Sequence, residues 1–296
     1  MNLTRREALS TLAATAALPG AAYNPTLTVQ IYVFTQQFAA RKQTLAEGMA
    51  EAFPAIRRAG YHRVELVDSF FSPELREKTI SLLQQHGLEC PVAYSGAVVH
   101  EAARAEKEIA RVLELASVAK TAGARAINVN PGVKPNQELK TDAELALQAQ
   151  SLNRLGAALR QRGMRLMTHH HTPELKAHGR EWRYQLKHTD PKLVYTCVDT
   201  DWALRSGEDP IGMLRESGPR LLSLHLRTGH NGVWAEALED GDPDYHAIAN
   251  YLKQSGFSGY LVVELAYEKA TRVTRSLEEN IRLSREYAER VFGVKA

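Results

Sequence analysis

The sequence predicts an α/β protein that folds as a closed (β/α)8 TIM barrel. Short β-branched or aromatic segments alternate with helical segments eight times, without a linker or a change in composition. Strands that alternate with helical patterns are typical of a parallel sheet. The chain has 296 residues, a usual length for one such barrel. The arrangement that competes with it is an open, doubly wound sheet.

The first half of the chain supplies four strand-and-helix units. Thr44 and Ser72 are good helix-capping residue types, and Gly60 and Gly87 stand where the first two helices should end. The expected strands are residues 27–34, 64–67, 90–94 and 126–129, and the expected helices are residues 44–59, 72–86, 101–122 and 141–162.

The second half repeats the pattern. The fifth strand is followed by a shorter and more polar connection over residues 173–187. The expected strands are residues 165–168, 194–198, 221–226 and 260–263, and the expected helices are residues 209–217, 245–255 and 275–292.

Residues 1–22 have the pattern of an export signal. Arg5 and Arg6 precede an Ala-rich apolar run that ends in small residues up to Ala22, which is typical of a twin-arginine signal. An ordinary amphipathic first helix is the alternative interpretation. We expect a mature single barrel domain over residues 23–296 in the periplasm or secreted, with no membrane contact beyond export, because no run approaches the ~20 apolar residues of a membrane span.

The charge of the chain bears on its binding partners, and its two cysteines bear on the core. The formal net charge is +3 and the chain has no run of Lys or Arg, which argues against binding to nucleic acid. Cys90 and Cys197 lie in apolar strand-like runs, so we expect both in the core. A disulfide between them stays open.

Four predicted strands each end on a residue that can bind a metal. The run that begins at Arg165 ends on three consecutive histidines, of which His169 is the first, and the next three strands end on Asp199, His225 and Glu264. In a barrel, residues at the carboxyl ends of different strands form the active site. We therefore expect these four residues to bind one divalent metal ion, such as Mn²⁺, Co²⁺ or Zn²⁺.

The histidine run leaves one assignment open. Neighbouring residues of a strand point to opposite faces, so His171 lies on the same side as His169, and His170 on the other. His171 could therefore replace His169 as the ligand, and we favour His169.

Further residues near the predicted strand ends are candidates for substrate contacts. Glu65 is a carboxylate in an apolar run and needs a partner. The partner could be a ligand, or an ion pair with Arg63 or with a neighbouring strand. Arg227 lies two residues after His225, hence on the same side of its strand, and could bind an anionic oxygen. The predicted substrate-binding residues are Glu65, Asn128, Trp202 and Trp234, although the tryptophans could equally serve packing.

Several motifs resemble one known family. They are VDTDWA (198–203), GEDP (207–210), SLHLR (223–227), GDPDY (241–245) and GYLVVE (259–264). With them, residues 27–293 resemble the xylose isomerase-like TIM barrels known as sugar phosphate isomerases/epimerases, whose relatives include ketose 3-epimerases and inosose dehydratase. The resemblance implies a metal held by His169, Asp199, His225 and Glu264.

The chain departs from the epimerase branch at one ligand. That branch has a glutamate at the end of the fifth strand, which also moves a proton, whereas this chain has a His-x-His variant that begins at His169. The departure puts a two-glutamate epimerisation in doubt. It leaves Glu264 as one candidate base and His169 or His171 as the second acid or base.

The sequence therefore predicts a metal-dependent isomerase or epimerase that acts on a sugar or sugar derivative. Glu264 would remove a proton next to a metal-bound carbonyl and hydroxyl pair, a histidine such as His171 would return it, and Arg227 would assist. The alternatives are a metal-dependent lyase or dehydratase acting on a keto-sugar or glycoside, and a secreted, non-catalytic carbohydrate-binding barrel. In each case the partner is a small carbohydrate, and an oligomer is possible.

Overall fold

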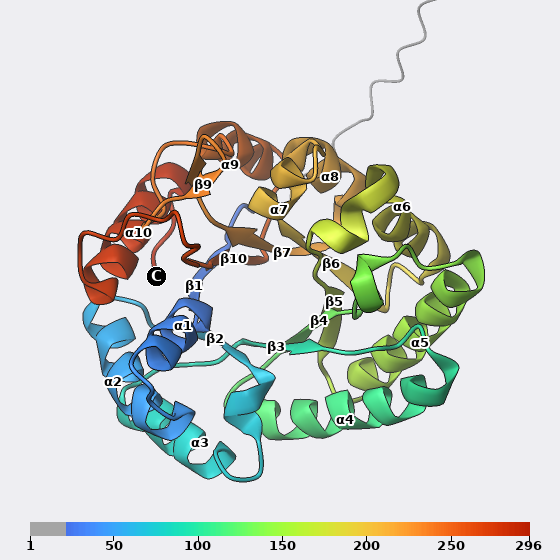
Figure 1. The fold of residues 1–296 in the computed structure, drawn as a ribbon, viewed down its shortest axis with the longest axis horizontal. Coiled ribbons are helices and arrows are strands. Elements are labelled where there is room, and N and C mark those ends of the chain that lie inside the picture. Colours follow the sequence, from blue (N-terminus) through green and yellow to red (C-terminus); the bar gives the residue numbers. More distant parts are fainter. Residues whose placement is uncertain (1–21) are drawn as a thin grey trace, which may run out of the picture.

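A computed structural model describes residues 22–296, in which eight parallel strands form a closed barrel inside a ring of helices (Figure 1). The expected export signal lies outside the described residues, except for Ala22. Within residues 22–296, no helix is both long and apolar enough to cross a membrane.

The strand order confirms a closed barrel and rules out the open sheet. β1 pairs in parallel with both β2 and β10, so the ring has no free edge. The barrel strands are β1 (Thr26–Gln30), β2 (Val64–Val67), β3 (Val92–Gly96), β4 (Ala126–Asn130), β5 (Arg165–Thr168), β6 (Val194–Asp199), β7 (Leu221–Leu226) and β10 (Tyr260–Val263).

Helices follow the strands and cover the outside of the barrel. Thr44 and Thr141 cap two of them through reciprocal hydrogen bonds with Glu47 and Glu144. The helices are α1 (Tyr32–Ala40), α2 (Leu45–Arg58), α3 (Arg76–Gln85), α4 (Ala102–Thr121), α5 (Asp142–Gln161), α6 (Thr172–His188), α7 (Thr200–Arg205), α8 (Pro210–Ser217), α9 (Tyr245–Gln254) and α10 (Leu277–Phe292).

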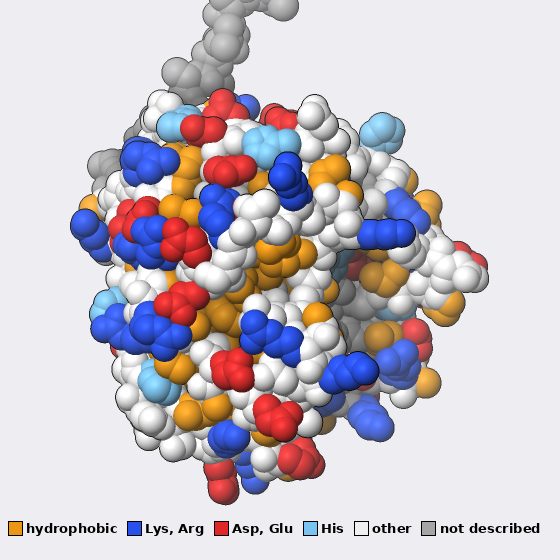
Figure 2. Space-filling view, turned by 60° about the vertical axis from the view of Figure 1, so that its left-hand side comes forward, with side chains coloured by type: hydrophobic (Ala, Val, Ile, Leu, Met, Phe, Trp, Pro, Cys, Tyr) orange, Lys and Arg blue, Asp and Glu red, His pale blue; other side chains and the backbone are white. Residues whose placement is uncertain are grey.

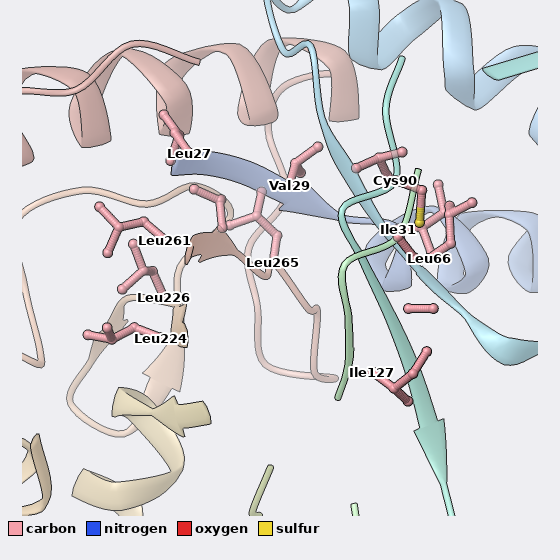
Figure 3. Packing of buried hydrophobic residues seen from close by; sticks show 14 of the residues in the cluster. Leu27, Val29, Ile31, Leu66, Cys90, Ile127, Leu224, Leu226, Leu261 and Leu265 are labelled. Atoms are coloured by element: carbon pink, nitrogen blue, oxygen red, sulfur yellow. The ribbon is translucent and has the colours of Figure 1, made fainter. Parts of the chain in front are cut away.

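Alternation along the strands separates the apolar core from the polar interior. Leu27 and Val29 of β1 pack in the core between strands and helices, together with Leu66, Leu224 and Leu261 from other strands (Figure 3). Because successive side chains point to opposite faces, the residues between them point into the barrel. The polar residues at these inward positions include Thr28, Gln30, Glu65, Asn128, Asp199, Ser223, His225 and Glu264, all of them buried.

Two predicted elements differ from the structure near the ends of strands. The first strand ends at Gln30, and Tyr32 to Phe34 begin helix α1, whose buried Val33 and Phe34 explain the strand-like apolar pattern. Ser72 does not cap α3, which begins at Arg76 after a turn. Two short elements were not predicted: helix α7 directly after β6, and a hairpin of β8 (Gly229–His230) and β9 (Val233–Trp234).

Both cysteines are buried and free, as expected for core residues. On the surface, acidic and basic side chains are interspersed over the face shown in Figure 2. Pairs such as Arg58 and Glu278, with an N–O distance of 2.7 Å, are exposed and contribute little to stability. Stability must therefore come mainly from the apolar layer around the barrel.

A buried carboxylate fixes the segment between β7 and α9, which carries the hairpin. Glu236 accepts hydrogen bonds from the backbone N of Thr274 at 2.7 Å and from Asn280 Nδ2 at 3.1 Å, and it pairs with Arg275 at 2.9 Å. Burial alone raises the pKa of Glu236, but the hydrogen bonds from Thr274, Asn280 and Arg275 outweigh it and lower the pKa to about 2.

Glu236→Gln should make the free energy of unfolding depend less on pH in the acidic range. The folded-state pKa lies below the unfolded value of ~4.3, so the contribution of Glu236 is present above that pH and is lost as the pH falls towards 2. We expect the variant to lose on the order of 2 kcal/mol at neutral pH and to show a smaller change between pH ~4.5 and ~2. Urea unfolding at several pH values measures both effects.

The matched control is Glu51→Gln, which breaks an exposed pair with Arg41. This variant should change the unfolding free energy by less than ~0.5 kcal/mol. An equal loss in the two variants would contradict the anchoring role of Glu236.

Candidate active site

The four predicted metal ligands converge at the carboxyl ends of β5, β6, β7 and β10. One ligand atom from each of His169, Asp199, His225 and Glu264 lies within 4.8 Å of those of the others, and all four residues are buried. The register explains the convergence, because Asp199 pairs with His225 across β6 and β7, and Glu264 N donates to the carbonyl of Leu226 at the end of β7.

The donor set fits a divalent cation. Among the described residues, neither ring nitrogen of His169 has a hydrogen-bond partner, although the side chain is almost fully buried. Nε2 of His169 lies 3.5 Å from Asp199 Oδ2. Burial lowers the pKa of His169 well below its usual value, which keeps the ring neutral and free to act as a ligand. Buried, unpartnered imidazole nitrogen next to carboxylates is the arrangement that a bound cation would satisfy.

Arg227 holds the two carboxylates of the cluster together. Its terminal nitrogen lies 3.2 Å from Asp199 Oδ2 and 2.8 Å from Glu264 Oε2. Burial raises the pKa of Asp199 to about 6, against the lowering effect of Arg227. Burial also raises that of Glu264, but Arg227 and His225 outweigh it and bring the pKa of Glu264 well below its usual range. Glu264 is therefore the carboxylate that stays ionised.

Asp199 serves the fold and the cluster at once. Oδ1 accepts hydrogen bonds from the backbone N–H groups of Asp201 at 3.0 Å and Trp202 at 2.9 Å, which caps α7. Oδ2 faces His169 and Arg227. The cap holds Trp202 beside the cluster, with its ring centroid 5.6 Å from the guanidinium carbon of Arg227.

The three consecutive histidines point in different directions. His170 turns outward, with its ring 6.5 Å from that of Trp182 in α6. His171 is half-buried, and its ring centroid lies 4.7 Å from that of His169. The predicted alternation is confirmed, and the geometry places His169 in the cluster and His171 beside it.

Two residues that were not predicted hold His171. Asn130 Nδ2 lies 3.1 Å from His171 Nδ1 and 3.1 Å from Glu174 Oε1, while Glu174 Oε2 accepts from the backbone N of His171 at 2.9 Å. Asn130 Oδ1 accepts from the N–H of Gly132, so its Nδ2 is the donor to the ring. Nε2 of His171 is left for a ligand. The Glu three residues after His171 could have revealed this capping pattern.

Glu65 and Asn128 lie beneath the cluster and contact His225. Glu65 Oε1 is 3.1 Å from His225 Nε2, and Asn128 Nδ2 is 3.4 Å from the same nitrogen. Arg63, the partner considered from the sequence, pairs with Glu89 instead. Glu65 is fully buried, which places it on the barrel side of His225. Burial lowers the pKa of His225, but Cys197, Glu65 and Glu264 raise it to well above the usual value.

Aromatic rings form one wall of the cluster. Trp234 lies beneath two guanidinium groups, those of Arg227 at 4.3 Å and Arg205 at 4.6 Å, and its Nε1 donates to Asp201 at 2.8 Å. Trp202 meets Trp234 edge to face, with centroids 5.4 Å apart. These contacts therefore position the guanidinium of Arg227, rather than leaving an aromatic face free to stack on a substrate. Tyr94 of β3 is a further neighbour that was not predicted, and its ring lies 5.4 Å from that of His169.

Comparisons with known proteins agree with this fold. The family described as Xylose isomerase-like TIM barrel matches residues 53–289 of the chain. A sugar phosphate isomerase/epimerase from Parabacteroides distasonis has a TM-score of 0.71 at 17% identity, covering 96% of this chain and 99% of that one. D-allulose 3-epimerase from Methylomonas sp., in complex with D-allulose, has a TM-score of 0.74 at 16% identity, covering 92% and 99%.

Among curated proteins, inosose dehydratase from Clostridium tetani is 30% identical over 148 residues, which cover 44% of this chain and 50% of that protein. The chain thus spans about half the length of this relative. The structural similarities, all under 25% identity, show the fold alone.

Variants of Asp199 should separate its two roles. Asp199→Asn keeps an oxygen that can cap α7, whereas Asp199→Ala removes it, and both remove the negative charge beside Arg227. We expect the Ala variant to be less stable than the Asn variant by about 1 kcal/mol, the usual contribution of a helix cap. Chemical denaturation measures the difference, and equal stabilities would show that the cap contributes nothing.

Proposed function

The chain belongs to the xylose isomerase-like TIM barrel family, and we propose that it is a metal-dependent isomerase or epimerase acting on a sugar or sugar derivative. The observation that carries the proposal is the convergence of two buried imidazoles and two carboxylates at the carboxyl end of the barrel. In this fold, active sites lie at that end.

His169, Asp199, His225 and Glu264 would hold the ion. When bound, a divalent ion would polarise a substrate carbonyl and so acidify the neighbouring C–H group. Arg227 would orient the substrate through its buried Nε, which has no hydrogen-bond partner among the described residues. A guanidinium group can donate to a carbonyl, a hydroxylate or a phosphate oxygen.

Glu264 is the candidate base. It combines an ionised carboxylate with a small exposed fraction of 7%, the largest of the four proposed ligands. Arg227 and His225 fix one of its oxygens, Oε2, at 2.8 and 2.9 Å. We infer that Oε1 takes the proton from the substrate carbon.

His171 is the candidate for the second proton transfer. Its ring lies 4.7 Å from that of His169 and 5.6 Å from that of Trp202, on the β5 and β6 side of the cluster, whereas Glu264 follows β10. An isomerase or epimerase needs a second group to deliver a proton to the neighbouring atom or to the opposite face. Asn130 occupies Nδ1, so Nε2 would be the nitrogen that acts.

Glu264→Gln should abolish exchange of the substrate C–H with solvent. Loss of a general base lowers rates by ~10²–10⁴-fold, so we expect deuterium uptake from D₂O into keto-sugars to fall by that factor. NMR of the recovered substrate measures it. Glu278→Gln, which breaks the exposed pair with Arg58, is the control and should exchange as fast as the parent. Equal exchange in Glu264→Gln would refute the base assignment.

A lyase or dehydratase acting on a keto-sugar or glycoside is the second candidate. The curated relatives include inosose dehydratase, which favours it. The family resemblance also implies that His169 takes the place of the epimerase branch's glutamate. The same proton abstraction followed by loss of a β-oxygen needs one base and one acid, which Glu264 and His171 would supply.

Product analysis should separate the two candidates. With D-allulose, L-ribulose and an inosose as substrates, an isomerase or epimerase yields products of unchanged mass, whereas a dehydratase yields a product lighter by one water. Mass spectrometry and NMR distinguish these outcomes. We expect unchanged mass. Loss of water would favour the second candidate, and retained metal without turnover of any keto-sugar or glycoside would favour a carbohydrate-binding barrel.

A further inference from the structure

Glu65 is a buried carboxylate that the proposed reaction does not use. It is 0% exposed, and its carboxylate contacts His225. An uncompensated buried carboxylate is costly, so its partners should indicate its role. Both partners, Gln30 Nε2 at 3.2 Å and His225 Nε2 at 3.1 Å, contact the same oxygen, Oε1.

The hydrogen bonds around Gln30 fix the direction of this contact. The backbone N–H of Tyr32 donates to Gln30 Oε1 at 3.3 Å, so the amide NH₂ of Gln30 faces Glu65 and donates to it. Oε1 of Glu65 is therefore an acceptor. A ring nitrogen 3.1 Å from this acceptor must carry a hydrogen, which places that hydrogen on Nε2 of His225.

The other ring nitrogen of His225 then faces the cluster. Nδ1 lies 2.9 Å from Glu264 Oε2, so without an ion it can carry the second ring hydrogen and donate to that carboxylate. A divalent cation bound to Nδ1 would take the place of this hydrogen, because a ring nitrogen that binds a metal must offer its lone pair. The hydrogen on Nε2 would then be the only one left on the ring, and Glu65 accepts it.

We propose that Glu65, held by Gln30, is a positioning residue that fixes the tautomer and orientation of His225 so that Nδ1 binds the metal. The inference rests on the metal site of the proposed function. Carboxylates that accept the remote N–H of a metal-binding histidine orient the ring and strengthen the ligand. Glu65 thus acts through His225 and not on the substrate.

Asn128 faces the same ring nitrogen with its amide NH₂, an orientation that must be reversed to suit a hydrogen on Nε2. Within the described part of the chain its Oδ1 has no hydrogen-bond partner, while its Nδ2 lies 3.4 Å from His225 Nε2. Rotating the amide by half a turn would place Oδ1 beside the ring hydrogen and give that hydrogen a second acceptor.

Two substitutions of Glu65 test the proposal through metal affinity. Glu65→Gln keeps an oxygen that can accept from Nε2–H, whereas Glu65→Leu removes the acceptor and keeps a similar side-chain volume. We expect Co²⁺ to bind ~10–100-fold more weakly to the Leu variant, and within a few-fold of the parent to the Gln variant. Competition with a chelator gives the affinity, and the visible absorption of bound Co²⁺ reports a changed ligand set.

Leu66→Ala is the matched control. Leu66 neighbours Glu65 in β2 but points into the apolar layer, so its truncation loosens the same strand without touching His225. It should lower thermal stability and leave the affinity for Co²⁺ close to that of the parent. If Glu65→Leu does not fold by circular dichroism, Gln30→Leu takes its place, since it removes the group that orients Glu65, and a several-fold loss of affinity is expected.

The outcomes separate this inference from the proposed function. A parent protein that binds no Co²⁺, Mn²⁺ or Zn²⁺ would overturn the metal site, and this inference with it. Tight binding by the parent together with unchanged affinity and spectrum in Glu65→Leu, or in Gln30→Leu where that variant replaces it, would overturn the positioning role alone. Equal losses in Glu65→Leu and Leu66→Ala would show a general effect of the strand and also reject the proposal.

Discussion

The constraint on which this structure depends is the burial of charge inside the barrel. Glu65, Asp199, Glu264 and Arg227 are all buried, and an isolated charge in such an environment is strongly disfavoured. Each of these groups therefore needs a partner of opposite sign or a donated hydrogen bond. Arg227 bridges Asp199 and Glu264, while His225 bridges Glu264 and Glu65. The proposed metal site is the point where these pairs meet.

The outer parts of the fold position these partners. Asp199 caps α7, which carries Trp202, and the hairpin of β8 and β9 carries Trp234; both rings lie against the guanidinium of Arg227. Glu236 ties the segment that carries this hairpin to the start of α10. The same contacts that stabilise these loops thus fix the direction in which Arg227 and Asp199 point. Stability and site geometry are coupled here through shared residues.

The barrel and the four-residue cluster could be predicted because both follow from simple periodicities. The alternation of side chains along a strand predicts that His225 and Glu264 point into the barrel. In a closed parallel barrel the carboxyl ends of all strands lie at the same end, so residues at those ends come together. What could not be predicted depends on direction in three dimensions. Val33 and Phe34 read as strand because helix α1 buries them as fully as a strand would. That Glu65 contacts His225 from beneath, across the barrel, depends on strand tilt, which no local pattern records.

The charges of the buried cluster suit a divalent ion. Three carboxylates, those of Glu65, Asp199 and Glu264, and one guanidinium, that of Arg227, carry a net formal charge of −2 when the histidines are neutral. Burial keeps His169 neutral, so it cannot offset this charge. Protonation of His225 alone would offset half of it, and a single divalent cation would offset it all. A glutamate in place of His169 would add a further negative charge to the cluster. A histidine at the end of β5 thus leaves room for the charge of the buried Glu65. This third carboxylate contacts the far nitrogen of His225, where it would orient the proposed ligand without itself binding the ion.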